Sequence, residues 1–185
     1  MNTRVPETFY QTYEPRLQRR IARELHSARR VVDLGCGDCE LASLLCDVDG
    51  HEVIGVDIDG EDFPKKLDRK GRRRCVKADA RCLDFVSTGT MDAVVSVSAL
   101  HEFEAPMAVL REARRILRPG GEILIVDFPS GSLAQRLWDE RYYTTAEVGE
   151  MLKRAGFARV EAKRLARRQL TWAQGFKASR PKGSR

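Results

Sequence analysis

Apolar residues follow two recurring patterns along the chain. Short, almost continuous apolar runs, typical of buried strands, occur at residues 30–34, 53–58, 75–79, 92–98 and 122–128. Apolar residues at helical spacing predict amphipathic helices at residues 14–28, 38–46, 62–70, 106–117 and 144–155. Two alternating segments, 158–166 and 169–178, predict two further strands at the end of this pattern.

The alternation of strands and helices predicts the fold class. Strands that are apolar throughout are buried on both faces, so we expect a parallel sheet covered by helices on both sides. The last two strands are joined by too few residues for a crossover helix, which predicts an antiparallel hairpin at the edge of the sheet. The expected organisation is one α/β domain over residues 29–178, with a helical lead-in packed on it over 1–28 and a basic tail over 179–185.

Length and charge narrow the classes of function. A chain of 185 residues can bury one core, and no apolar run approaches the ~20 residues that span a bilayer. The first ten residues lack an apolar signal stretch, so we expect a cytoplasmic protein with no membrane partner. The net charge of +6 permits an RNA partner, although an arginine-rich solvated surface is the preferred explanation.

Cysteine usage gives little support to a metal or disulfide role. The chain has five cysteines, and an odd number without a signal sequence argues against a secreted disulfide framework. Cys36 and Cys39 have the spacing of a metal knuckle or redox pair, but a four-ligand zinc site needs a second pair that the sequence lacks. We therefore predict no metal site and interpret this segment as a glycine turn.

Acidic residues stand at the ends of three consecutive predicted strands. Asp33, Asp57 and Asp79 would meet at the carboxyl edge of a parallel sheet, where ligands bind in open α/β folds. Gly35 and Gly37 let the backbone turn tightly and approach a ligand closely. These groups fit an adenosyl ligand: Asp57 for the ribose hydroxyls, Asp79 for the adenine amine and Asp33 for a cationic amino group.

A dinucleotide fits the same loop poorly. The fingerprint G-x-G-x-x-G requires a third small residue where this chain has Glu40. Asp38 and Glu40 would also place negative charge where a pyrophosphate must lie. The chain lacks the Gly-Lys-Ser/Thr of a P-loop as well, so the loop favours a ligand that carries a ribose and an adenine but no phosphate.

The motifs together resemble those of class I S-adenosylmethionine-dependent methyltransferases of the type 11, quinone-methylase-like branch. The resemblance rests on the ordered segments 31–38, 56–58, 78–80, 92–101, 117–128 and 142–157. It implies a Rossmann-like, doubly wound seven-stranded sheet of order 3-2-1-4-5-7-6 with the last strand antiparallel. It also implies S-adenosylmethionine as cofactor, and it adds to the expected cofactor-binding residues those that stand inside the matching motifs: Cys36, Ile58, Ala80 and Ser96.

Methyl transfer from a sulfonium is a direct displacement, so positioning dominates and a base is needed only for an acceptor that carries a proton. His101, just past the fourth strand, is the candidate base; packing against the cofactor is the other interpretation. Tyr142 and Tyr143 are candidates for the acceptor pocket or for the core. The expected acceptor is a small molecule, with a base of ribosomal or transfer RNA, or a non-catalytic cofactor-binding subunit, as alternatives.

Overall fold

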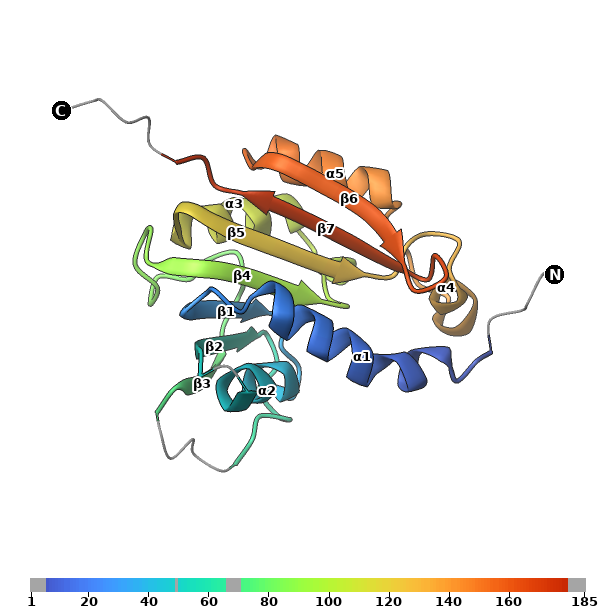
Figure 1. Ribbon diagram of the computed structural model, residues 1–185, viewed down its shortest axis with the longest axis horizontal. Coiled ribbons are helices and arrows are strands. Elements are labelled where there is room, and N and C mark those ends of the chain that lie inside the picture. Colours follow the sequence, from blue (N-terminus) through green and yellow to red (C-terminus); the bar gives the residue numbers. More distant parts are fainter. Residues whose placement is uncertain (1–5, 49, 66–70, 180–185) are drawn as a thin grey trace.

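The computed structural model describes residues 6–48, 50–65 and 71–179. It contains a seven-stranded sheet of order β3-β2-β1-β4-β5-β7-β6 (Figure 1). The pairs among β1 to β5 are parallel, whereas β7 runs antiparallel to both β5 and β6. The predicted fold class, strand order and antiparallel last strand are confirmed. The strands are β1 Arg30–Leu34, β2 Glu52–Asp57, β3 Arg73–Lys77, β4 Met91–Val97, β5 Leu117–Asp127, β6 Ala158–Leu165 and β7 Leu170–Phe176.

Helices cover both faces of the sheet. They are α1 Phe9–Glu24, α2 Glu40–Val48, α3 Pro106–Ile116, α4 Leu133–Trp138 and α5 Thr145–Arg154. One apolar cluster joins α1 and α2 to alternate residues of the central strands, and a second joins α3 and α5 to the opposite face. The short helix α4 lies near the carboxyl ends of β4 and β5, and α1 extends toward it (Figure 1).

Local sequence signals explain several helix boundaries. Thr144 and Glu147 form a capping box at the start of α5, in which each side chain accepts a hydrogen bond from the other residue's backbone N–H. Pro106 occupies the first turn of α3, where a missing N–H has no cost. The chain passes from α3 into β5 and from α5 into β6, so these two helices connect successive strands of the sheet.

Other boundaries differ from the expectation. The helix predicted from residue 14 begins at Phe9, because aromatic residues extend its packing surface: the rings of Phe9 and Tyr13 stack with centroids 5.6 Å apart. Strand β3 ends at Lys77, so Asp79 follows the strand instead of closing it. Strand β5 begins at Leu117 instead of at the predicted residue 122, and so includes Pro119 and the two glycines that follow it. The α4 helix was not predicted.

Some predictions fall on residues that the structure does not describe. The helix expected at residues 62–70 is turn up to residue 65, and residues 66–70 lie outside the described ranges. The same holds for residues 1–5 of the lead-in and for residues 180–185 of the basic tail. The division of the chain at residues 28 and 178 therefore stays a prediction.

Candidate functional site

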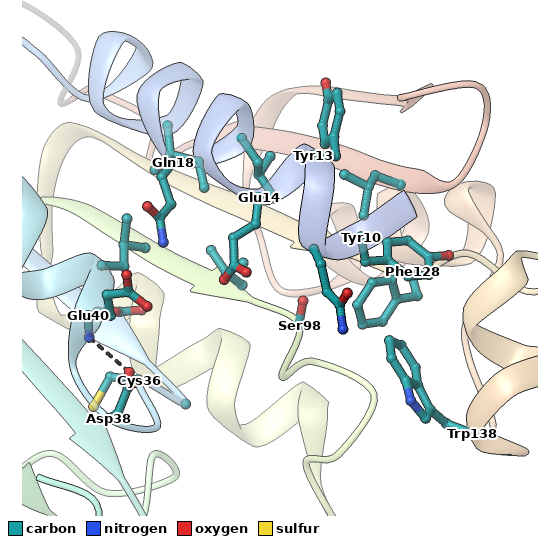
Figure 2. Close-up of a pocket in the computed structure, with 18 residues that line it drawn as sticks. Tyr10, Tyr13, Glu14, Gln18, Cys36, Asp38, Glu40, Ser98, Phe128 and Trp138 are labelled. Carbon is teal, nitrogen blue, oxygen red and sulfur yellow. Dashed lines mark hydrogen bonds between the residues drawn. The ribbon is translucent and has the colours of Figure 1, made fainter. Parts of the chain in front are cut away.

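Two pockets open side by side at the carboxyl edge of the parallel strands. Each has a volume of about 370 Å³, and both are lined by Gly35 and Ser98. The first pocket lies between α1 and the ends of β1 and β4 (Figure 2). The second lies beyond β2 and β3, against the segment that leads into α3. A ligand that crosses Gly35 and Ser98 would occupy both.

The loop after β1 brings backbone close to both pockets. Gly35 has φ +71°, and a Cβ on it would lie 2.3 Å from Cβ of Ala99, so no other residue fits there without displacing the loop. Gly37 also has positive φ but faces open space. The N–H of Gly37 donates to Oδ2 of Asp57 at 2.8 Å, so the carboxylate at the end of β2 holds the turn in place.

The second pocket has the polarity expected for an adenosine. Asp57 lines it at the end of β2 beside Ile58, whose side chain is 71% exposed and offers an apolar surface. Ala80 and Asp79, which follow β3, line the same pocket. The Asp79 carboxylate is paired with Arg81 at 2.7 Å, and hydrogen bonds from Arg81 lower the pKa of Asp79. Asp79 is therefore ionised, and it already accepts hydrogen bonds from both the backbone N–H and the guanidinium of Arg81.

Asp33 lines the first pocket from the end of β1, with only 2% of its surface exposed. Burial, and then the negative charges of Asp57 and Asp38, raise the pKa of Asp33 to about 7. None of the ion pairs among the described residues involves Asp33. A buried carboxyl group of this kind is suited to a cationic group that would restore its charge.

The end of β4 contributes Ser98 to both pockets. Ser98 has φ +54°, an uncommon conformation for a residue with a side chain, and strained residues of this kind concentrate at functional sites. Ser96, the residue expected from the resemblance, is 1% exposed and lines neither pocket. Its Oγ finds no hydrogen-bond partner within the described chain.

Cysteines lie beneath the glycine turn. Cys36 lines the first pocket, and its Sγ lies 3.3 Å from that of Cys39. Burial, followed by the charge of Asp33, raises the pKa of the Cys36 thiol, which therefore stays protonated. Cys39 is joined to Cys75 of β3 by a disulfide bond. The sequence offered no sign of this pairing, because it depends on how β3 aligns with the start of α2.

His101 lines neither pocket, and a buried carboxylate holds its imidazole. Its Nδ1 is 2.8 Å from Oδ1 of Asp127, the last residue of β5, and its backbone N–H donates to Oδ2 of the same residue. Its Nε2 faces Glu140 at 3.1 Å. Burial opposes the imidazolium, but the hydrogen bond and charge of Asp127, with the charge of Glu102, outweigh it and raise the pKa of His101.

The two tyrosines predicted for the acceptor pocket or the core lie in different surroundings. The Tyr142 ring packs on His101 with centroids 4.4 Å apart, and its hydroxyl donates to Glu140 at 2.9 Å. Tyr143 packs against the apolar cluster on the α3 and α5 side. Neither lines one of the two pockets. Asp127 and Glu140 were missed, although Asp127 follows the same pattern of an acid at a strand end that singled out Asp33 and Asp57.

A metal ion has one candidate position among the described residues. His101, Glu102 and Glu140 present ligand atoms that all lie within 4.8 Å of one another. No metal site was predicted, because only the cysteine spacing was considered. This cluster gives no local sequence signal, since Glu140 is remote in the chain from the other two residues. Asp127 would orient the imidazole in such a site, as carboxylates commonly do for metal-bound histidines.

The outer wall of the first pocket comes from α1 and from the segment after β5. Tyr10, Glu14 and Gln18 face the pocket from α1, and Phe128 and Trp138 close its other end (Figure 2). The hydroxyl of Tyr10 accepts from the N–H of Ala134 at 3.0 Å and so ties α1 to α4. None of these residues was predicted, since helix α1 is far from the strand-end motifs in sequence.

Comparison with known proteins settles the family. The family model described as "Methyltransferase domain" matches residues 32–125. The chain belongs to this family. Its relatives and fold identify it as a class I, S-adenosylmethionine-dependent type with quinone-methylase-like relatives, as the sequence motifs predicted.

Two curated relatives show how far the similarity extends. The chain is 29% identical over 140 residues to the ubiquinone/menaquinone biosynthesis C-methyltransferase UbiE of Blochmanniella floridana, covering 70% of this chain and 55% of that protein. It is 31% identical over 110 residues to the 27-O-demethylrifamycin SV methyltransferase of Amycolatopsis mediterranei, covering 56% and 40%. The chain therefore spans about half the length of the curated relatives it matches.

Solved structures share the fold. A chain of the complex between the Haloferax volcanii Trm112 methyltransferase activator and a methyltransferase superposes with a TM-score of 0.74 at 17% identity, covering 96% of both chains. The Burkholderia thailandensis 1,6-didemethyltoxoflavin-N1-methyltransferase, solved with S-adenosylhomocysteine, gives 0.67 at 22% identity, covering 93% of this chain and 84% of that one. Within the described ranges, no helix is both long and apolar enough to cross a membrane.

Proposed function

We propose that this chain binds S-adenosylmethionine and transfers its methyl group to a small organic acceptor. The observation that carries the proposal is the placement of Asp57: it holds the glycine turn through Gly37 and lines a pocket of about 370 Å³ beside an exposed apolar side chain. This is the arrangement that a ribose and an adenine require, because one carboxylate can accept both ribose hydroxyls while the base rests on apolar surface.

The residues present fit the cofactor in both pockets. In the second pocket, Asp57 would accept from the ribose and Asp79 from the adenine amine, with Ile58 and Ala80 against the base. In the first pocket, Asp33 would receive the amino group of the methionine part. Gly35 and Cys36 would border the ligand where the pockets join, since both lie on the turn between them. When bound, the cofactor supplies an electrophilic methyl group.

His101 is the proposed base for an acceptor that carries a proton. Asp127 accepts a hydrogen bond from Nδ1 and leaves Nε2 as the atom that takes the proton, and it also stabilises the imidazolium that results. In this structure Glu140 occupies Nε2, and its side chain is 50% exposed, so an acceptor hydroxyl would replace it there. Tyr142 keeps the imidazole in place by packing on its face.

Charge favours a small acceptor over RNA at this site. The charged side chains that line the first pocket in the described structure are all acidic. The second pocket is also lined by Arg81, but this cation is paired with Asp79 and Glu104. Phosphates would be repelled from such an entrance. The relatives named for 27-O-demethylrifamycin SV and 1,6-didemethyltoxoflavin carry the names of small organic molecules, which supports the same choice.

The test begins with cofactor binding. Asp57→Ala removes the proposed ribose acceptor and one anchor of the glycine turn, so affinity for S-adenosylhomocysteine should fall at least about 100-fold by calorimetric titration. Asp59→Ala is the matched control, because Asp59 is an exposed neighbour that does not line the pocket. Unchanged affinity in Asp57→Ala would contradict the ribose role.

Methyl transfer is tested with methyl-labelled cofactor and cell extract. Label should enter the small-molecule fraction and survive prior RNase treatment. Label that enters RNA would establish the RNA alternative instead. Binding of the cofactor with no labelled product in any fraction would favour a non-catalytic subunit.

A further inference from the structure

The first pocket has an aromatic end. Tyr10, Phe128 and Trp138 pack against one another there, with ring centroids 4.8 Å apart for Tyr10 and Phe128 and 5.1 Å for Phe128 and Trp138. Trp138 is 48% exposed and adjoins Tyr10 at 5.5 Å. A large indole left half in solvent at the mouth of a cavity offers a face on which a planar ring can stack.

The remaining wall of the pocket is acidic. Its charged residues in the described structure are Glu14, Asp33, Asp38 and Glu40, and no lysine or arginine lines it there. This is a marked local excess of negative charge in a chain whose net charge is +6. Asp33 is nearly completely buried and has no hydrogen-bonding or ion-pairing partner among the described side chains. A positive charge to balance it would therefore have to come from a ligand.

These acids are not equivalent. Asp38 accepts a hydrogen bond from the backbone N–H of Glu40, the first residue of α2. Asp33 lies next to the glycine turn, where the proposed function places the amino group of the cofactor. Glu14 is left over: it projects from α1 toward the centre of the pocket, between the acidic and the aromatic ends, and bonds to nothing in the described chain (Figure 2).

We propose that the acceptor is a planar aromatic compound that carries a cationic amine, held by ring stacking at Trp138 and by the carboxylate of Glu14. The proposal rests on the proposed function, since it names the substrate class of that same site. An ammonium group near Glu14 gains a charge-assisted hydrogen bond and the attraction of nearby ring faces. A carboxylate or phosphate on the same scaffold would face several acids with no cation to receive it.

A matched pair of probes tests the proposal on the full chain saturated with S-adenosylhomocysteine. Tyramine and 3-(4-hydroxyphenyl)propionate share a phenol ring and a two-carbon arm, and differ in ending with an ammonium or a carboxylate. We expect tyramine to bind more tightly by at least about tenfold in calorimetric titration. Equal affinity, tighter binding of the acid, or no tyramine binding up to about 10 mM would overturn the proposal.

Single substitutions test which side chains cause the preference for tyramine. Glu14→Gln should reduce the ratio between the two probes to about twofold or less, because it removes both the attraction for the ammonium and the repulsion of the carboxylate. Trp138→Ala should lower the affinity for both probes by a similar factor. Glu7→Gln removes an exposed acid from the same end of the chain, outside this pocket, and should leave the ratio unchanged. A ratio that Glu14→Gln does not alter would overturn the assignment.

The two proposals fail in different ways. S-adenosylhomocysteine is titrated first into each variant, so cofactor binding is known before a probe is added. Retained cofactor binding without a preference for tyramine overturns the substrate class alone. Loss of cofactor binding in the unmodified chain overturns the proposed function, and with it the substrate class.

Discussion

Asp33 combines almost complete burial with a pKa raised to about 7, because burial and the nearby charges of Asp57 and Asp38 disfavour its ionised form. In the unfolded chain the same carboxyl group titrates near its ordinary value of 3.8. The folded protein therefore binds the extra proton between these two values, and loses stability as the pH rises from about 4 to about 7. The free energy of unfolding should decrease by up to about 4 kcal/mol across this window.

Asp33→Asn isolates this effect at the residue scale. Asparagine does not ionise, so the variant should be more stable than the parent at pH 8 and of similar stability at pH 4, as measured by urea unfolding without cofactor. Affinity of the parent for S-adenosylhomocysteine should rise with pH through about 7, since the ionised carboxylate is the form that attracts an amino group. Parallel pH dependence in parent and variant would contradict the role of Asp33.

At the scale of elements, α1 depends on contacts that its own sequence does not reveal. The hydroxyl of Tyr10 donates to Gln169 and accepts from the backbone of Ala134, linking α1 to α4 and to the turn before β7. Tyr10→Phe keeps the ring but leaves these partners unmatched, so we expect a loss of about 1 kcal/mol in urea unfolding.

Tyr13→Phe is the matched control for that loss. Tyr13 lies one turn further along α1, and its hydroxyl points away from the pocket and makes no hydrogen bond within the described residues (Figure 2). Its removal should leave the free energy of unfolding unchanged. Equal effects of the two substitutions would mean that the contacts of Tyr10 do not anchor the helix.

Contacts between segments that are distant in the chain also limit what could be predicted from the sequence. The glycine turn and the strand-end acids follow from local patterns and from the rule that parallel strands end at one edge of the sheet. The strand order was implied by the resemblance to a known family, because local patterns do not say which strands are neighbours. Glu140 comes from a loop, Trp138 from α4 and Glu14 from α1, and no sequence periodicity connects these segments to the strand ends. Ser98 lines the pockets where Ser96 was expected because the backbone turns into positive φ at that residue, which a strand pattern does not encode.

At the scale of the whole molecule, positive and negative charges are segregated. The net charge is +6, and arginines on the outer side of α1, such as Arg16, Arg19 and Arg23, are exposed, whereas the first pocket carries acids. A polyanion can therefore bind to the outer surface without reaching the proposed site. Such contacts consist of phosphate pairing alone, so their affinity should fall steeply with salt and show little sequence preference.

This segregation makes a prediction that separates RNA binding from RNA methylation. Affinity for a single-stranded RNA should decrease by at least about tenfold between 50 and 200 mM salt, while affinity for S-adenosylhomocysteine should change little, because its pocket is local and partly enclosed. Replacing Arg16, Arg19 and Arg23 by glutamine should weaken the RNA further and leave cofactor binding intact, which filter binding and calorimetry can measure in parallel. If RNA and cofactor instead bound with mutual enhancement that resisted salt, the acidic pocket would have to admit a nucleic acid, and the outer arginines would belong to substrate recognition.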